Sequence, residues 1–347
     1  MKKFGKRFFA CSILTLFFSA LFAVFCAGYL RFLLSPVDKS REDVQMVKIE
    51  QGTSARGIGE LLYSMNLVRS KEAFYVAVRF PEKLLGLSSP VVLRSGVYAV
   101  TSAMSVSQIV DMISSGREAF VKTVIPEGLT IKKIARILEN HKICSAQKFE
   151  EAAKNEQMLR SFNIPAQNCE GYLFPDTYFF YENMDADEVI FQMISNFYKN
   201  LSTLGIEQID FKTLTLASIV EREYRVEEEA PLIASVFQNR IEAGVGLYSC
   251  ATIEYIITEI QGKPHPDIIT YNDLKIDSPY NTYRWAALPP GPISNPGLVS
   301  LSASLNPPKT DYFFFTLSDA EAGRHTFSTN ISQHINATAQ FRTKRSN

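Results

Sequence analysis

"IEQGTSARGIGELLYSMNLVRS" (49–70) and "IPEGLTIKKIARILENHKICS" (125–145) are two copies of one weak repeat. Gly52 aligns with Gly128, and two positions later each copy has a Ser or a Thr. In each copy this pattern predicts the end of a strand, a turn at the glycine, a helix cap and an amphipathic helix. The repeat therefore predicts small strand-plus-helix units and an α+β fold.

Further strands and capped helices follow the same logic. "GVYAVTSAMSVSQIVDMI" (96–113) runs from a strand into a helix, and Ser105 and Gln108 have the spacing of a capping box. "CEGYLFPDTYFF" (169–180) alternates turn residues with aromatic residues, which predicts a turn and then a strand.

The C-terminal half is predicted to be mainly helical. Helical patterns occupy 186–202, 211–224 and 229–244. Residues 265–297 are rich in Pro, Asn, Tyr and Gly, so they predict a long ordered loop, and such loops are often functional. "DYFFFTLS" (311–318) predicts a buried strand, and 325–328 is expected to pair with it.

Composition limits the function. The chain of 347 residues is 46% hydrophobic and 21% charged, which is enough for two or three modest folded domains. Its formal net charge is zero, which argues against nucleic acid as a partner. The five cysteines and four histidines match no metal-binding motif, so we expect no metal site, and the reaction predicted below requires no organic cofactor.

The N-terminal segment predicts a membrane anchor. Residues 8–30 contain no charged residue, and 23 helical residues are long enough to span a bilayer core of about 30 Å. Basic residues precede the segment at Lys2, Lys3, Lys6 and Arg7. This charge bias predicts a single-pass transmembrane helix with the N-terminus in the cytoplasm and the rest of the chain outside. A cleaved signal peptide is the alternative.

"LASIVEREY" (216–224) ends an apolar run with two carboxylates, Glu221 and Glu223. On a helical wheel Glu223 lies nearer the middle of the apolar face and Glu221 lies at its edge, so the pattern does not select one of them. It does predict that at least one carboxyl group lies against apolar surface. Desolvation raises the pKa of a carboxyl group, as a general acid near neutral pH requires. The alternative is an ion pair with Arg222 or Arg225 at a helix end.

The predicted loop contains side chains that suit a sugar. Tyr280, Asn281, Tyr283 and the only Trp of the chain, Trp285, lie in "SPYNTYRWAALPPGPISNPG" (278–297). Aromatic faces stack on pyranose rings and amides bond to hydroxyl groups. An acid, a loop of this kind and a location outside the cytoplasm together point to cell-wall glycan, and core or turn roles are the alternative.

Several motifs in one order, from about residue 47 to 340, resemble the MltG-like (YceG-like) endolytic murein transglycosylases. They are "IPEGLTIKKIARIL", "EGYLFPDTYFF", "LASIVEREY", "SVFQNRIEAGVGL", "SPYNTY", "LPPGPISNPG" and "NPPKTDYFFF". The resemblance implies a lyase at the inner membrane, with a periplasmic catalytic domain, that cuts nascent peptidoglycan strands internally. It also implies that Glu221, which follows "ASIV", is the catalytic acid.

The resemblance and the residues together define the expected organisation. We expect a cytoplasmic tip and anchor at 1–34, a linker at 35–45, a LysM-like glycan-binding α+β region at 46–160 and an α+β catalytic domain at 161–341. Substrate binding is predicted for Glu223, Ser249, Thr252, Tyr280, Asn281, Thr282 and Tyr283.

One stretch departs from the family pattern. Where the family usually reads Gln-Ser-Asp-Pro-Thr, this chain has Tyr248, Ser249, Cys250, Ala251 and Thr252. A polar side chain and a carboxylate are lost, which predicts an altered sugar-binding shell beside an unchanged catalytic acid.

The predicted reaction is non-hydrolytic cleavage of the MurNAc-β-1,4-GlcNAc bond to give 1,6-anhydroMurNAc ends. Glu221 would act first as acid and then as base. Two alternatives are a non-catalytic, membrane-anchored peptidoglycan-binding protein that recruits synthases, and a hydrolytic muramidase with Glu223 or another acid as second carboxylate. The expected partners are glycan strands and, as further candidates, peptidoglycan synthases.

Overall fold

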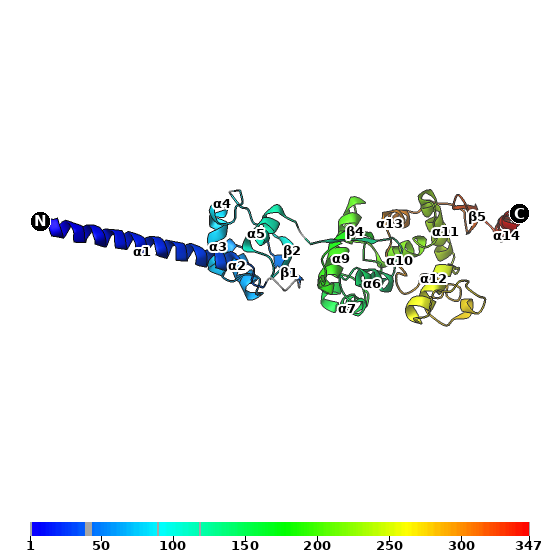
Figure 1. Ribbon diagram of the computed structural model, residues 1–347. Helices are drawn as coiled ribbons and strands as arrows, with labels where there is room; N and C mark the ends of the chain where they lie inside the picture. The colour runs from blue at the N-terminus through cyan, green and yellow to red at the C-terminus, as the bar shows by residue number, and fades with distance from the viewer. Residues whose placement is uncertain (1, 39–43, 89, 118, 347) are drawn as a thin grey trace. The chain divides into compact units, whose positions relative to one another are not determined.

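The computed structural model describes residues 2–38, 44–88, 90–117 and 119–346, with side chains described between 18 and 341 in these ranges. The chain forms two compact units, Met1–Phe120 and Val121–Asn347. Helices and short antiparallel strands occur in both units (Figure 1), so the predicted α+β class is confirmed.

The first unit is built around one two-stranded sheet. Its elements are α1 (Lys2–Leu34), β1 (Val44–Ile49), α2 (Ala55–Ser64), α3 (Lys71–Arg79), α4 (Pro81–Leu84), β2 (Gly96–Thr101) and α5 (Val106–Ser115). β1 and β2 pair antiparallel, with Ile49 opposite Gly96. The core of this unit lies between the sheet and α2, α3 and α5, and it includes Ile58, Phe74 and Tyr98.

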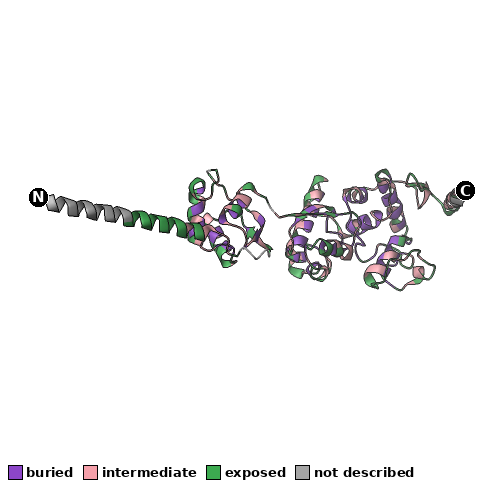
Figure 2. Ribbon diagram, viewed as in Figure 1, coloured by how far each residue is buried: buried purple, intermediate pink, exposed green. Residues whose placement is uncertain are grey.

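The N-terminal helix lies partly outside the described side chains. Within the predicted anchor at 8–30, nothing is described of the side chains of 8–17, whereas those from Phe18 onward are mostly exposed (Figure 2). A search of the described residues finds no helix that is both long enough and apolar enough to cross a membrane. Of the predicted linker at 35–45, residues 39–43 lie outside the described residues, and β1 already begins at Val44.

Both copies of the repeat fold as the sequence predicts. In the first copy Gly52 has a φ of +84°, and the Ser54 hydroxyl accepts a hydrogen bond from the Gly57 N–H at the start of α2. In the second copy Gly128 has a φ of +72°, and Thr130 caps the helix that follows. The left-handed backbone at these glycines explains the residue type, because a side chain is disfavoured there. The predicted capping box of Ser105 and Gln108 is also confirmed.

The second unit holds most of the helices. Its elements are β3 (Val121–Ile125), α6 (Ile131–Asn140), α7 (Ala146–Ala152), α8 (Glu156–Ser161), β4 (Asp176–Phe180), α9 (Ala186–Thr203), α10 (Phe211–Val220), η1 (Glu227–Glu229), α11 (Ala230–Glu242), α12 (Cys250–Tyr255), η2 (Ile256–Ile260), η3 (Asp273–Lys275), α13 (Leu298–Leu305), β5 (Phe314–Asp319), β6 (Arg324–Ser328) and α14 (Ile331–Ser346). The predicted strand at the end of 169–180 is β4, which pairs antiparallel with β3. The predicted pairing of 325–328 with the preceding strand is also confirmed.

Packing divides the chain earlier than the predicted boundary between 160 and 161. Helices α6, α7 and α8 share one buried core with α9, so residues from Val121 onward belong to the second unit. The large side chains of this core include Phe149, Tyr172 and Phe197, and each is at most 2% exposed. The second copy of the repeat therefore belongs to the same packed body as α10.

A second core supports the C-terminal half of the unit. It joins α10, α11 and α13 through residues such as Ile219, Phe237 and Ala303. The loop predicted at 265–297 is irregular apart from the short helix η3 and a single antiparallel bridge from Ala286 to Gly246. The helix predicted at 211–224 ends at Val220. Beyond it the N–H groups of Arg222 and Glu223 bond to the carbonyl oxygens three residues back, those of Ile219 and Val220, instead of four residues back.

Candidate active site

Glu221 lies at the C-terminal end of α10, a helix with a long buried run. α10 begins at the Asp210 cap, whose carboxylate accepts from the N–H groups of Lys212 and Thr213. Every residue from Leu214 to Val220 is buried. Glu221 is the first residue beyond this run, so its backbone is fixed by the helix while its side chain reaches partly open surface.

Three donors hold the carboxylate of Glu221. Its Oε2 accepts a hydrogen bond from the Gly297 N–H at 2.9 Å and from the Ser300 hydroxyl at 2.7 Å. Its Oε1 accepts from the Tyr224 hydroxyl at 3.3 Å. Gly297 is the N-cap of α13, so one free N–H of that helix is satisfied by the carboxylate.

The environment of Glu221 raises its pKa. Burial is the main cause, because it disfavours the charged form, and the nearby carboxylate of Glu127 acts in the same direction. The bonds from Ser300, Gly297 and Tyr224 oppose this effect because they stabilise the ionised form. The result is a carboxyl group that keeps its proton to a higher pH than an ordinary Glu and has donors ready for the charge once the proton leaves.

Glu223 is placed at a different site from Glu221. Its Oε1 accepts a hydrogen bond from the Ser249 hydroxyl at 2.5 Å, and burial raises its pKa against the opposing charges of Arg222 and Arg240. The two carboxylates therefore contact different donors, and neither is among the charges that shift the pKa of the other.

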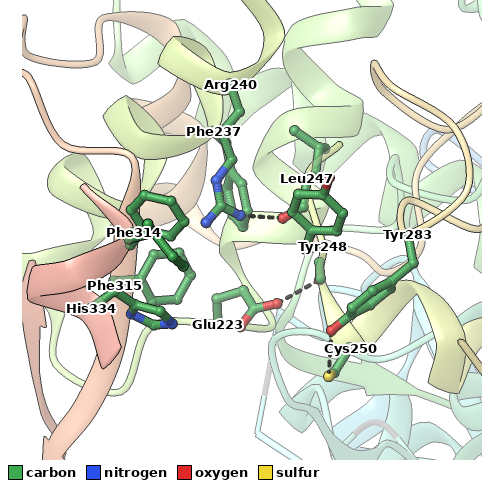
Figure 3. A pocket seen from close by; sticks show the side chains of 12 residues that line it. Glu223, Phe237, Arg240, Leu247, Tyr248, Cys250, Tyr283, Phe314, Phe315 and His334 are labelled. Atoms are coloured by element: carbon green, nitrogen blue, oxygen red, sulfur yellow. Dashed lines mark hydrogen bonds between the residues drawn. The ribbon is translucent and has the colours of Figure 1, made fainter. Parts of the chain in front are cut away.

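Glu223 lines a cavity of about 460 Å³ (Figure 3). The other lining residues are Phe237 and Arg240 of α11, Leu247 to Cys250, Tyr283, Phe314 and Phe315 of β5, and Ile331 and His334 of α14. Arg240 donates to the carbonyl oxygens of Phe313 and Leu247, so it fastens β5 and the turn before α12 to α11. The cavity thus combines aromatic faces with a carboxyl group and a guanidinium group.

The structure separates the predicted substrate-binding residues into three groups. Glu223, Ser249 and Tyr283 share the cavity, where the Tyr283 hydroxyl lies 3.0 Å from the Cys250 sulfur. Thr252 and Thr282 are buried directly behind it, with their hydroxyl oxygens 2.9 Å apart.

Asn281 and Tyr280 instead brace the loop that contains them. The Asn281 side chain is fully buried, donates to the carbonyl oxygens of Leu274 and Ile276, and accepts from the Tyr283 N–H. The Tyr280 ring packs on Tyr255 with a centroid separation of 5.1 Å.

Asn295 joins three segments that are distant in sequence. Its Oδ1 accepts from the N–H groups of Gly171 and Leu173, at 2.8 and 2.9 Å. Its Nδ2 donates to the Leu129 carbonyl oxygen and to Glu170. The side chain is 1% exposed, so these bonds replace water completely. The residue thereby fixes the segment just before Gly297 against both α6 and the turn before β4.

The profile of the YceG-like family matches residues 47–340, which is most of the chain. The chain belongs to the YceG-like family.

Two relatives of this YceG-like protein have the same name. The chain is 30% identical to the endolytic murein transglycosylase of Bacillus subtilis over 334 residues, which cover 90% of this chain and 89% of that relative. It is 28% identical to the endolytic murein transglycosylase of Streptococcus pneumoniae, covering 88% of this chain but 61% of the longer relative. The crystal structure of a yceG-like protein from Listeria monocytogenes matches with a TM-score of 0.54 and 29% identity, over 85% of this chain and 99% of that one.

Sequence reasoning missed several residues that surround Glu221 in this YceG-like protein. Tyr224, Gly297 and Ser300 bond to its carboxylate, and Glu127 lies beside it. "SNPG" (294–297) was available as a signal, because a Pro-Gly pair marks a turn and Gly is among the residues preferred at a helix N-cap. The sequence did not indicate that this helix start faces Glu221.

Proposed function

We propose that this YceG-like protein is an endolytic lytic transglycosylase, which cleaves the MurNAc-β-1,4-GlcNAc bond of nascent peptidoglycan and leaves 1,6-anhydroMurNAc ends. The names of its relatives from Bacillus subtilis and Streptococcus pneumoniae support this reaction. The observation that carries the proposal is the partly buried Glu221 carboxyl group, which has a raised pKa and is held by Gly297 and Ser300.

In the proposed mechanism Glu221 acts first as an acid. Its proton passes to the glycosidic oxygen as the bond from MurNAc C1 breaks, which leaves an oxocarbenium-like centre and a carboxylate. The N–H of Gly297 and the hydroxyl of Ser300 stabilise that carboxylate where it forms. The carboxylate then takes the proton of the muramoyl C6 hydroxyl while the oxygen of that hydroxyl bonds to C1. This closes the anhydro ring and returns Glu221 to its starting form.

This route needs only one proton-transferring carboxylate. Ordinary glycosidases use two, one of which activates water or attacks the sugar. Here the nucleophile is part of the substrate, so its high effective concentration replaces the second group, provided that the protein holds the ring correctly. We propose that Glu223, Ser249 and Tyr283 contribute to that holding from their cavity, and that Thr252, Tyr280, Asn281 and Thr282 act behind them as supports.

The alternatives make different demands on the structure. A hydrolytic muramidase with Glu223 as second carboxylate requires both groups to face one sugar, whereas Glu223 bonds to Ser249 and Glu221 bonds to α13. A non-catalytic glycan-binding protein has no need for a carboxyl group of raised pKa held by three donors. The geometry therefore favours the lytic reaction over a hydrolase that uses Glu223 and over a role in binding alone.

We further propose that the chain is anchored in the cytoplasmic membrane through residues 8–30, with its N-terminus in the cytoplasm and the residues from about 31 onward outside. This rests on the uncharged run and the basic residues before it. We propose that 46–160, which spans most of the first unit and the beginning of the second, is a LysM-like region that binds glycan. We also propose that peptidoglycan synthases are partners. The repeated pattern of strand, glycine turn and capped helix supports a shared binding role for this region.

The test is the chemistry of the products. The full chain and its Glu221→Gln variant are incubated with isolated peptidoglycan in water labelled with heavy oxygen, and the fragments are analysed by mass spectrometry. We expect unlabelled anhydromuramoyl ends from the wild type and none from a variant with an unchanged circular dichroism spectrum. Labelled reducing ends would identify a hydrolase, and uncut glycan with folded wild-type protein would favour the binding alternative.

A further inference from the structure

Glu127 is an exposed carboxylate at the proposed active site, and it is not used in the mechanism above. It follows Pro126 in the turn between β3 and α6, which belongs to the second copy of the repeat. This turn is held in place by backbone bonds on both sides. The Gly128 N–H donates to the Asn295 carbonyl oxygen at 2.9 Å, and the Asn295 N–H donates to the Leu129 carbonyl oxygen at 2.8 Å.

The Glu127 carboxylate occupies the space left by the missing side chain of Gly297. A Cβ atom on Gly297 would lie 2.1 Å from Oε1 of Glu127, far inside contact distance. Gly297 has a φ of −86° and a ψ of −179°, which any residue adopts, so its backbone does not require glycine. What glycine provides here is room for a carboxylate directly over the N–H group that bonds to Glu221.

Glu221 approaches the same turn from the other side. A Cβ on Gly128 would lie 3.5 Å from Cγ of Glu221 and 3.3 Å from Cδ of Arg222. The Arg222 guanidinium is directed elsewhere, because its Nη2 bonds to Glu254 at 2.8 Å. The other groups that face the Glu221 carboxylate are the hydroxyls of Tyr224 and Ser300 and the N–H of Gly297, so the charge that faces it is the negative charge of Glu127.

We propose that Glu127 is a positioning residue of the active site, whose negative charge keeps the proton on Glu221 until the glycosidic oxygen receives it. This inference rests on the proposed function. Like charges that share a site favour the protonated form of one of them. The charge of Glu127 acts in the same direction as burial, so Glu221 keeps its proton to a higher pH than burial alone would allow.

The test is the pH dependence of kcat/KM for release of anhydromuramoyl ends from uncross-linked glycan strands by the full chain. The alkaline limb of this profile reports the pKa of the essential acid in the free enzyme. Removing a nearby negative charge lowers that pKa, so Glu127→Gln is expected to move the limb to lower pH by about half a unit. This shift corresponds to about a threefold loss of rate on the alkaline side. Glu127→Asp keeps the negative charge, so its alkaline limb is expected to lie close to that of the wild type.

Gly297→Ala supplies an independent variant. The alanine methyl group displaces the flexible Glu127 carboxylate and leaves the Gly297 N–H in place, so the same shift is expected without any change at residue 127. In the double variant the two shifts should not add, because both remove one interaction. The control is Glu207→Gln, which removes an exposed carboxylate that does not contribute to the pKa of Glu221.

The outcomes separate this inference from the proposed function. A wild type that makes no anhydromuramoyl ends would overturn both. If the wild type makes anhydromuramoyl ends but neither Glu127→Gln nor Gly297→Ala moves the alkaline limb, only the inference about Glu127 is overturned. A loss of rate that is equal at all pH values, or additive in the double variant, would also overturn it, because it would indicate a structural or a substrate-contacting role.

Discussion

The Ser300 hydroxyl lies 2.7 Å from Oε2 of Glu221 and donates a hydrogen bond to it. Ser300 is on the first turn of α13, so the donor is presented by a regular helix whose N-terminal end also favours negative charge. This bond and the Glu127 carboxylate act on the same group in opposite directions, because one stabilises the anion and the other disfavours it.

Ser300→Ala is expected to shift the alkaline limb of kcat/KM to higher pH, opposite to Glu127→Gln. Without the hydroxyl the anion of Glu221 loses its strongest side-chain donor, so its pKa rises further. We expect a shift of about half a unit to one unit. Ser300→Thr keeps a hydroxyl at this position and serves as the control. A limb that moves down, or moves equally in both variants, would contradict the role of this bond.

Asn281→Ala is expected to lower stability rather than glycan affinity alone. The variant leaves the carbonyl oxygens of Leu274 and Ile276 and the N–H of Tyr283 without their partner. We expect a loss of about 2–3 kcal/mol in the free energy of unfolding, measured with urea. Asn281→Asp keeps an acceptor but places a charge against two carbonyl oxygens, so it should be worse. Unchanged stability with lost glycan binding would instead support the sugar contact predicted from the sequence.

Glu170→Gln is expected to reduce the pH dependence of stability. Burial raises the pKa of Glu170 to about 8, above the value of an exposed carboxyl group. A group whose pKa is higher in the folded state stabilises the fold below the unfolded pKa and loses that contribution as the pH rises toward 8. The slope is at most about 1.4 kcal/mol per pH unit. Between the pKa of an exposed carboxyl group and pH 8, the urea midpoint of the Glu170→Gln variant should therefore rise increasingly above that of the wild type.

Glu207→Gln is the control for this comparison, because Glu207 is exposed. Parallel pH profiles for the wild type and Glu170→Gln would mean that Glu170 is ionised in the folded protein throughout this range.

Ser249→Ala is expected to destabilise the fold most when Glu223 is ionised. Ser249 is 2% exposed, and its hydroxyl supplies the 2.5 Å bond to the buried carboxyl group. Losing this donor raises the pKa of Glu223 further and should cost about 1–3 kcal/mol of stability on the alkaline side. The measurement is urea unfolding at acid and alkaline pH, with Ser249→Thr as the variant that keeps a hydroxyl. An equal loss at both pH values would indicate a packing effect only.

Local features were predictable from the sequence because their causes are local. The glycine turns at Gly52 and Gly128, the caps at Ser54 and Thr130, and the Ser105 capping box each depend on a few adjacent residues. They therefore needed no knowledge of distant packing.

The site was predictable only in part, because its geometry depends on contacts between distant segments. The apolar run before Glu221 predicted a desolvated carboxyl group, and the pKa values of both Glu221 and Glu223 are raised by burial. A helical wheel does not show that α10 ends at Val220, after which the two side chains reach different sites. Likewise, the amide of Asn281 suggested a sugar contact, whereas its carbonyl partners are settled by how the loop folds back.

The four bonds of the Asn295 side chain form only after residue 295 has been synthesised. A ribosome has already released Glu127, Glu170 and Glu221 long before it reaches residue 295. Until that residue and Ser300 emerge, the carboxylate of Glu221 has neither its helix nor its hydroxyl donor. A chain that is interrupted before this point carries Glu221 without Gly297 and Ser300, so we expect it to lack the proposed cleavage activity.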